Sequence, residues 1–308
     1  MSTGLATLRA WVRASRLPSQ SYLALPLLLG QVMAVHAGGR ALDLATLVGV
    51  QLFGFLDQLF IVYANDWADQ ETDRHNRTAT LFSGGSRVLV EGLLPARALG
   101  MAAIACAGGL LAVSVGLAVG RGAPLLVPLA VAALALLWAY SYPPLRLSYR
   151  GGGELLQMVG VAVVLPLYGY VAQGGEPGRF PWALVAFLLP THLGCAIATA
   201  LPDEPSDRET GKLTLPARVG GERAAWAIVA LNGLTLALAP LGLGAVGLRA
   251  GVGLLVPAVA ALVVVLVRPA PPGSRLIQVR VAAAITATLA TVSLPLLGLW
   301  GSRGLHDP

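Results

Sequence analysis

Residues 44–73 read LATLVGVQLFGFLDQLFIVYANDWADQETD, and this segment establishes the class of fold. Its first part is predominantly apolar over the ~20 residues that a helix needs to cross a bilayer. It then changes abruptly into a run of acidic side chains. Apolar stretches of similar length recur along the 308-residue chain. The sequence therefore predicts a helical membrane protein with polar chemistry where spans end.

The composition supports this interpretation. Hydrophobic residues make up 56% of the chain, charged residues only 12%, and the mean hydropathy is +0.73. A soluble domain carries about 25% charged residues, so these values exclude a disordered chain and disfavour a soluble globular enzyme. Cys106 and Cys195 lie in apolar runs without metal-site spacing, and we interpret them as packing residues.

We predict an all-α, multi-pass bundle of about nine transmembrane helices around a central cavity, forming one domain over residues 1–308. The predicted spans are residues 17–38, 43–65, 98–119, 123–141, 155–173, 181–201, 224–242, 249–268 and 280–300. The basic start of the chain is also compatible with a signal peptide. Eight further spans favour an uncleaved first helix.

The 21 lysine and arginine residues predict the orientation. With the N-terminus in the cytoplasm, sixteen of them lie in cytoplasmic segments and five in outer segments. The positive-inside rule then places the N-terminus and the long polar loops in the cytoplasm and the C-terminus outside the inner (plasma) membrane. The net charge of +6 is explained by these membrane flanks, and we expect no nucleic-acid partner.

Acidic residues gather in two short windows, each at the end of a predicted span. Eight of the fifteen are Asp66, Asp69, Glu71 and Asp73 in the first window and Asp203, Glu204, Asp207 and Glu209 in the second. Both windows are predicted at the same depth on the cytoplasmic side. We expect them to form one site; the alternative is that they are solvated loop charges that pair locally.

Spacing within the windows places the aspartates on helix faces. Asp66, Asp69 and Asp73 are separated by three and four residues, which aligns them along one face of a helix. Asp203 and Asp207 are one turn apart. The proline between them is compatible with the first turn of a helix that begins near Asp203.

Like charges stacked on a helix repel one another, so this arrangement requires a cation. Carboxylate oxygens suit Mg²⁺, which keeps several waters and bridges carboxylates to substrate phosphates. We therefore predict Mg²⁺ as the cofactor, held around a diphosphate by Asp66, Asp69, Asp73, Asp203 and Asp207. The nearby basic residues that would neutralise the remaining phosphate charge are Arg74, Arg77, Arg87, Arg208 and Lys212.

The pattern Asn65-Asp66-x-x-Asp69-x-x-x-Asp73, followed by Asp203-x-x-x-Asp207, resembles the UbiA superfamily of intramembrane prenyltransferases. Three further stretches fit: Arg16-Leu17-Pro18, residues 140–151 (YSYPPLRLSYRG) and residues 211–220 (GKLTLPARVG). Residues 140–151, with residues 153–155 (GEL), are similar to the branch that prenylates 1,4-dihydroxy-2-naphthoate for menaquinone. Tyr142 stands where that branch usually has glycine.

The resemblance implies Mg²⁺-dependent transfer of a polyprenyl group from polyprenyl diphosphate to an aromatic acceptor acid within the membrane lipid. The five aspartates would be the catalytic metal-binding residues. Asn65 would bind the diphosphate or orient Asp69, while Lys212, Arg77 and Arg16 would contact phosphate. The preferred acceptor is 1,4-dihydroxy-2-naphthoate; 4-hydroxybenzoate or another quinone or lipid precursor is the alternative.

Other residues allow two interpretations each. Asp57, inside the second predicted span, either accepts a hydrogen bond from a ring hydroxyl or is protonated and structural, since carboxylates at membrane depth usually face a cavity or a partner. Arg146 either positions an acceptor carboxylate or holds its loop in the cytoplasm. Tyr140, Tyr142 and Tyr149 shield a carbocation or, more simply, belong to an interfacial aromatic belt.

A transporter that uses intramembrane carboxylates is the alternative from a different class. It predicts acidic residues distributed through the bilayer, whereas most acidic residues here gather at one face. His192, in the sixth predicted span, is interpreted as a packing residue.

Overall fold

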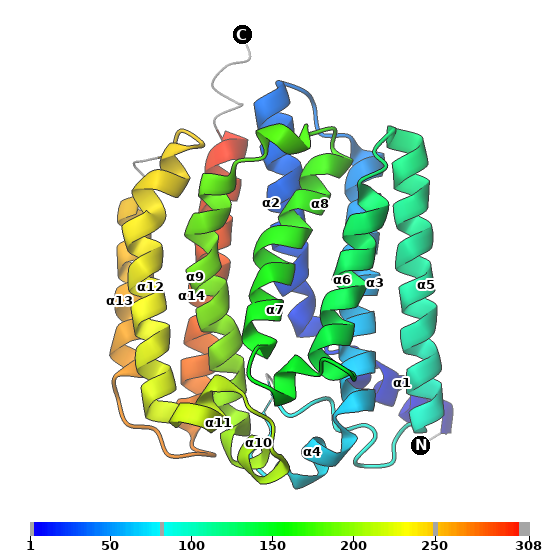
Figure 1. The fold of residues 1–308 in the computed structure, drawn as a ribbon, viewed down its shortest axis with the longest axis vertical. Helices are drawn as coiled ribbons and strands as arrows, with labels where there is room; N and C mark the ends of the chain where they lie inside the picture. The colour runs from blue at the N-terminus through cyan, green and yellow to red at the C-terminus, as the bar shows by residue number, and fades with distance from the viewer. Residues whose placement is uncertain (1–2, 81–82, 249–251, 302–308) are drawn as a thin grey trace.

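The computed structural model describes residues 3–80, 83–248 and 252–301, and all regular structure in these ranges is helical (Figure 1). Seven helical segments there are long and apolar enough to cross a membrane, and two shorter apolar helices stand beside them. The prediction of a multi-pass all-α membrane bundle is confirmed. Its count of about nine spans is met when the two shorter helices are included.

The helices of the bundle follow one another up and down in chain order. They are α2 (Gln20–Gly38), α3 (Leu44–Ala68), α5 (Ala96–Arg121), α6 (Leu126–Ser141), α7 (Gly153–Val159), α8 (Leu165–Ala172), α9 (Trp182–Ala200), α12 (Gly221–Gly244), α13 (Val252–Leu266) and α14 (Arg275–Gly301). Every described boundary lies within five residues of the predicted one. Residues 249–251 of the predicted eighth span, and Arg303 near the C-terminus, lie outside the described residues.

One end of the bundle carries four short helices, and we call it the site end. They are α1 (Thr3–Ala14), α4 (Gln70–His75), α10 (Glu204–Thr210) and α11 (Leu215–Val219). The N-terminus lies at this end and the C-terminus at the other (Figure 1), as an odd number of spans requires. Helix α1 was not predicted from the sequence, in which residues 3–14 are the basic flank of the first apolar span.

Helix α7 continues into α8 through one π-helical turn, Gly160–Val164. Four residues at this irregular turn, Gly160, Val161, Val164 and Leu165, line a cavity inside the bundle. Nearby, α8 packs closely on α2 at Gly30. The helices are so close there that a Cβ on this residue would collide with the Pro166 carbonyl oxygen. Small residues allow such close helix contacts in membranes. The irregular turn thus forms part of the cavity wall.

Candidate active site

The two acidic windows meet at the site end, where α4 and α10 pack against one another. Asn76 Nδ2 donates a hydrogen bond to Asp203 Oδ1 at 2.7 Å, although the two residues are 127 positions apart. The Gly84 N–H donates to Asp203 Oδ2 at 3.1 Å. Thr78 Oγ1 donates to the Pro202 carbonyl oxygen. The loop after the first acidic window is therefore fixed to the second.

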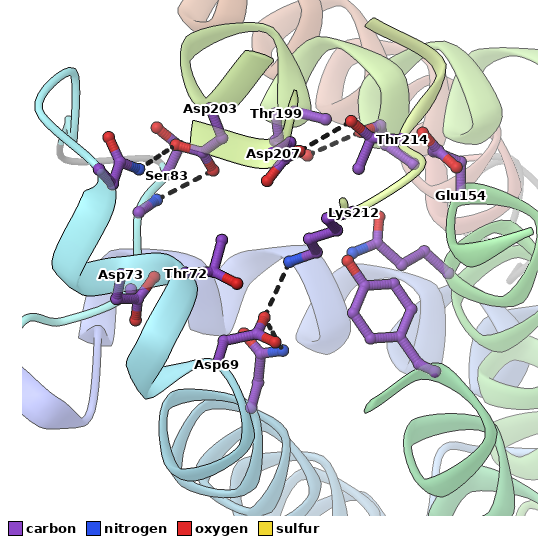
Figure 2. Close-up of a pocket in the computed structure, with 18 of the residues that line it drawn as sticks. Asp69, Thr72, Asp73, Ser83, Glu154, Thr199, Asp203, Asp207, Lys212 and Thr214 are labelled. Carbon is purple, nitrogen blue, oxygen red and sulfur yellow. Dashed lines mark hydrogen bonds and ion pairs between the residues drawn. The ribbon is translucent and has the colours of Figure 1, made fainter. Parts of the chain in front are cut away.

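A polar cavity of about 130 Å³ lies between the two windows (Figure 2). Four of the five predicted aspartates line it: Asp69, Asp73, Asp203 and Asp207. In Figure 2, Lys212 extends between Asp69 on one side and the pair Asp203 and Asp207 on the other. The structure thus brings four of the five predicted metal ligands and two predicted phosphate contacts, Lys212 and Arg16, to a common space.

The first acidic window lies across a break between α3 and α4, with Asp69 at the break. Helix-type hydrogen bonds continue there, from Asp69 N to Asn65 O (2.9 Å) and from Asp73 N to Asp69 O (2.8 Å). Asp66, Asp69 and Asp73 were expected on one helix face, but Asp66 does not line the polar cavity with the other two. Its Oδ2 accepts hydrogen bonds from the Ser86 backbone and hydroxyl, while its buried Oδ1 has no partner.

Gly85 explains where Asp66 and Asp73 are directed. A Cβ on Gly85 would lie 2.3 Å from Asp73 Oδ2 and 3.1 Å from Asp66 Oδ1, so both carboxylates face this bare stretch of backbone. The φ angle of Gly85 is +67°, a conformation that glycine adopts readily. Burial, reinforced by the charges of Asp66 and Asp69, raises the pKa of Asp73 to about 8. The positive charge of Lys212 does not offset burial and the neighbouring carboxylates at Asp73, and a bound cation would supply the charge that is missing.

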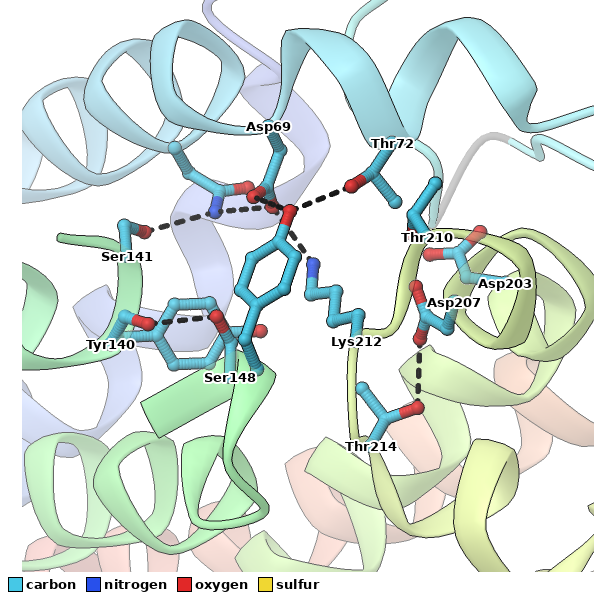
Figure 3. A network of polar contacts seen from close by, with 12 residues as sticks. Asp69, Thr72, Tyr140, Ser141, Ser148, Asp203, Asp207, Thr210, Lys212 and Thr214 are labelled. Carbon is cyan, nitrogen blue, oxygen red and sulfur yellow. Dashed lines mark hydrogen bonds and ion pairs between the residues drawn. The ribbon is translucent and has the colours of Figure 1, made fainter. Parts of the chain in front are cut away.

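Asp69 differs because protein groups already satisfy it (Figure 3). Its Oδ2 accepts from Lys212 Nζ at 2.8 Å and from Asn65 Nδ2 at 3.1 Å, and its Oδ1 accepts from Tyr149 Oη at 3.1 Å. Burial opposes charge on Lys212, but Asp69 and other neighbours more than compensate, so the pKa of Lys212 lies well above its usual value. Asn65 is placed where it can orient Asp69, one of the two roles predicted for it.

The second acidic window forms the start of α10, close to where the sequence predicts a new helix. Asp203 precedes the helix, and Asp207 Oδ2 accepts a hydrogen bond from Thr214 Oγ1 at 2.7 Å. The chain turns back after α10, and the Lys212 N–H donates to the Asp207 carbonyl oxygen at 2.8 Å. This turn directs Lys212 across the cavity toward the first window.

The remaining predicted substrate-binding residues are placed differently from one another. Arg16, with φ +43°, lines the polar cavity and a larger neighbouring cavity, and Asp57 lines the larger one. The Arg146 guanidinium lies 3.6 Å above the Tyr149 ring centroid and lines neither cavity. Arg77 is exposed and lines neither cavity. The structure therefore does not bring Arg77 and Arg146 into the cavities.

Most of the other basic residues near the windows form ion pairs or hydrogen bonds outside the polar cavity. Arg74 pairs with Glu71 on its own helix, and Arg208 pairs with Glu204 at 3.1 Å. Arg87 donates to the backbone carbonyls that follow the first window. Among the five predicted neutralising residues, Lys212 is the one that lines the polar cavity.

The tyrosines contact the site more closely than an interfacial belt requires. Tyr140 lines both cavities, and Tyr149 donates to Asp69. Tyr142 Oη donates to the Ala64 carbonyl oxygen at 2.6 Å. His192 is buried, contacts the Tyr22 ring edge-on and lines neither cavity, and neither of its ring nitrogens has a hydrogen-bond partner among the described residues.

The larger cavity, of about 900 Å³, extends from the polar cavity into the bundle and is mostly apolar. The residues that line both cavities are Arg16, Asn65, Gly85, Tyr140, Gln157, Ala196 and Thr199. The prediction of a central cavity is confirmed. A ligand with a charged head and an apolar body would fit both spaces at once.

The donor set fits Mg²⁺ shared with a phosphate ligand. Across residues 3–80, 83–248 and 252–301, no three acidic, histidine or cysteine side chains are grouped closely enough to hold an ion alone. Protein Mg²⁺ sites commonly use one or two carboxylates, with waters and substrate phosphates completing the shell. The unpaired Asp66 Oδ1 and the Asp73 carboxylate would be available as such ligands on the first window.

Several residues that hold the site in place were not predicted from the sequence. Asn76, Gly84 and Thr214 fix the second-window aspartates, and Gly85 faces the first window. The adjacent glycines 84 and 85, soon after the first window, were the available indication of a close backbone approach.

The model of the UbiA prenyltransferase family matches residues 23–280. The chain belongs to the UbiA prenyltransferase family. The recognition of the UbiA superfamily from the two aspartate motifs is thereby confirmed. No curated protein matches the chain.

Solved UbiA structures share the fold of this family member. The apo UbiA homologue from Aeropyrum pernix K1 is 20% identical, with a TM-score of 0.68 over 92% of this chain and 98% of that chain. The Archaeoglobus fulgidus homologue bound to GPP and Mg²⁺ is 16% identical, with a TM-score of 0.64 over 92% and 99%. A digeranylgeranylglyceryl phosphate synthase structure is 16% identical, with a TM-score of 0.63 over 95% and 98%. At these identities the matches show the fold.

Proposed function

We propose that this UbiA family member transfers a polyprenyl group from polyprenyl diphosphate to an aromatic acceptor with Mg²⁺ as cofactor. The observation that carries the proposal is the junction of two unlike cavities. A small polar cavity between two acidic windows opens into an apolar cavity of about 900 Å³. The first fits a metal-bound diphosphate, and the second fits a prenyl chain and a ring.

The site residues divide the work of binding the diphosphate. Asp66, Asp69, Asp73, Asp203 and Asp207 would hold the metal. Mg²⁺ bound there would stabilise the negative charge that develops on the departing diphosphate. Lys212 and Arg16, which line the polar cavity, would donate to its oxygens. A solved homologue from Archaeoglobus fulgidus that binds GPP and Mg²⁺ supports this assignment.

The apolar cavity protects the reactive carbon once the carbon–oxygen bond breaks. Tyr140 lies where the two cavities join, so its ring face can stabilise a developing allylic cation. The leucine and valine side chains of α6–α8 exclude water, which would otherwise trap the cation. The electron-rich acceptor ring then forms the new carbon–carbon bond and loses a proton or its carboxylate as CO₂.

The preferred acceptor is 1,4-dihydroxy-2-naphthoate, and the proposed role is in menaquinone biosynthesis. The similarity of residues 140–151 to that branch supports this choice. The alternatives are 4-hydroxybenzoate and other quinone or lipid precursors. The distribution of lysine and arginine residues along the chain supports a site end that faces the cytoplasm at the inner membrane.

The proposal is tested by incubating membranes that contain the protein with geranyl or longer prenyl diphosphates and a panel of acceptors, with and without Mg²⁺. The panel includes 1,4-dihydroxy-2-naphthoate, 4-hydroxybenzoate and geranylgeranylglyceryl phosphate. We expect prenylated naphthoate that disappears when EDTA removes the metal. Activity confined to another acceptor contradicts the acceptor choice, and no transfer to any aromatic acid contradicts the proposed reaction.

A further inference from the structure

The larger cavity has two chemically different walls. Below the polar junction, the wall from α6–α8 is apolar and consists of Ala133, Leu136, Leu137, Leu156, Gly160, Val161, Val164 and Leu165. The wall from the start of α2 and from α3 carries hydrogen-bonding groups: Ser19, Ser21, Tyr22, Asp57 and Gln58. A cavity for a prenyl chain alone needs no polar wall, so this division indicates a second kind of occupant.

Asp57 is the polar group on this wall that the protein leaves unsatisfied. The residue is 2% exposed, and its Oδ1 has no hydrogen-bond partner. The neighbouring Gln58 is different, because its Nε2 donates to Ser19 Oγ at 2.6 Å. A buried acceptor oxygen without a donor is costly, and carboxyl groups at membrane depth generally face a cavity or a partner. A ligand hydroxyl would supply the missing donor.

The position of Asp57 on α3 defines which part of a ligand it can reach. Asp57, Ile61 and Asn65 follow helical spacing and all line the cavity, so they form one stripe that leads from the polar junction inward. Asp57 is eight residues before Asn65, roughly 12 Å along the helix axis. The reacting carbon must stay near the diphosphate at the junction. Asp57 therefore lies on the inward side of the junction, where it can reach the side of the acceptor ring that faces into the bundle.

We propose that Asp57 accepts a hydrogen bond from a hydroxyl on the side of the acceptor ring that faces inward from the junction. The prenyl chain then lies along the apolar wall of α6–α8, and the acceptor ring lies along the wall of α2 and α3. This inference rests on the proposed aromatic prenyl transfer and specifies its acceptor class as a ring with a free hydroxyl group. Asp57 acts by contact with the substrate and selects it.

The test compares binding of 1,4-dihydroxy-2-naphthoate with binding of its monomethyl ethers, using the full chain in nanodiscs. Each ether removes one O–H donor and keeps the ring. The variants are Asp57→Asn, which is isosteric, and Asp57→Leu, which removes both oxygens. The control is Gln51→Leu, which removes a polar group from α3 outside both cavities. Geranyl diphosphate binding and Mg²⁺-dependent transfer are measured in parallel.

We expect the wild-type protein and Gln51→Leu to bind 1,4-dihydroxy-2-naphthoate about tenfold more tightly than one of its monomethyl ethers. This is the loss of affinity expected when a hydrogen bond to a charged group is removed. This ratio should approach one in Asp57→Leu and fall at least roughly threefold in Asp57→Asn. Geranyl diphosphate binding should not change. If the wild type prenylates the naphthoate and either folded Asp57 variant keeps the full ratio, this inference is wrong and the proposed function stands. If the wild type neither binds nor prenylates any aromatic acceptor, the proposed function fails, and the inference with it.

Discussion

The two acidic windows are similar in sequence, yet the protein treats them differently. In the second window, protein donors hold both aspartates: Asp203 accepts from Asn76 and Gly84, and Asp207 accepts from Thr214. Such donors fix the direction of a metal-binding carboxylate before the metal arrives. Hydrogen bonds from the protein thus fix the direction of both second-window carboxylates.

In the part of the chain that the structure describes, the first window contains carboxylate oxygens that no protein group binds. Asp66 Oδ1 is buried without a partner, and no protein donor holds the Asp73 carboxylate among the described residues. Asp69 is the exception, because Lys212 neutralises it. The comparison shows that the first window contains carboxylate oxygens without protein donors, while protein donors hold the carboxylates of the second window. The following predictions test that difference.

The largest effect is expected for Asp73→Asn. The amide removes the charge of the carboxylate that has no compensating donor, so kcat/KM for prenyl transfer should fall roughly 10²- to 10³-fold, as when a major transition-state contact is lost. The control is Glu71→Gln on the same short helix, where the side chain is exposed. Rates with saturating Mg²⁺ and prenyl diphosphate are the measurement. Equal activities of the two variants would show that Asp73 is not part of the site.

Lys212→Met should have the next largest effect. It removes one of the two cationic side chains that line the polar cavity, so kcat/KM for the prenyl diphosphate should fall roughly 10- to 100-fold, the loss expected for a hydrogen bond between charged groups. Arg74→Met removes an exposed cation near the same window and serves as the control. The measurement is steady-state kinetics at varied concentrations of prenyl diphosphate. An unchanged kcat/KM for the prenyl diphosphate in Lys212→Met would reject its role as a phosphate contact.

Gly85→Ala tests whether the bare backbone facing the first window is required. The added Cβ would collide with Asp73 Oδ2, so we expect a roughly tenfold or larger loss of activity, comparable to the disturbance of a metal ligand's supporting groups. Gly92→Ala introduces similar backbone strain, because its φ is +65°, but has no atom within 4 Å of the new Cβ. If both variants lose activity equally, backbone strain rather than the displaced carboxylate is responsible.

The smallest effect is expected for Thr214→Val. This change removes the donor to Asp207 but leaves the carboxylate, so activity should fall roughly tenfold. Thr210→Val removes a hydroxyl that donates only to the Ser206 carbonyl oxygen on α10, and it should retain activity. Transfer rates at several Mg²⁺ concentrations provide the measurement. A Thr214→Val enzyme with unchanged Mg²⁺ dependence would contradict pre-orientation of the second window.

Much of the fold was predictable because its spans are long apolar runs ended by charged loops. Helix α1 was not predicted, since its exposed Leu5, Leu8 and Val12 alternate with polar residues and the segment is too polar to span a bilayer. Its helical apolar spacing was nevertheless visible in the sequence. Span prediction detects total hydrophobicity, whereas an interfacial helix is defined by the division of its faces.

The aspartates were predictable from spacing, but their supporting contacts were not. Thr214 and Asn76 act through loops whose paths depend on how α4 and α10 pack, and single-sequence spacing carries no such information. The same reason explains why the predicted phosphate contact of Arg77 is not found. Arg77 lies just after the end of α4 and is exposed. Proximity in sequence to a motif therefore did not guarantee a place in its cavity.

The central claim is that the two windows bind one Mg²⁺–diphosphate unit together. Calorimetric titration of pyrophosphate, with and without Mg²⁺, into the wild type, Asp73→Asn, Asp207→Asn and the double variant tests it most directly. We predict that Mg²⁺ strengthens pyrophosphate binding at least about tenfold in the wild type, and that the double variant loses hardly more than either single variant, since coupled sites are not additive. Mg²⁺-independent binding, or losses that simply add, would contradict a shared site.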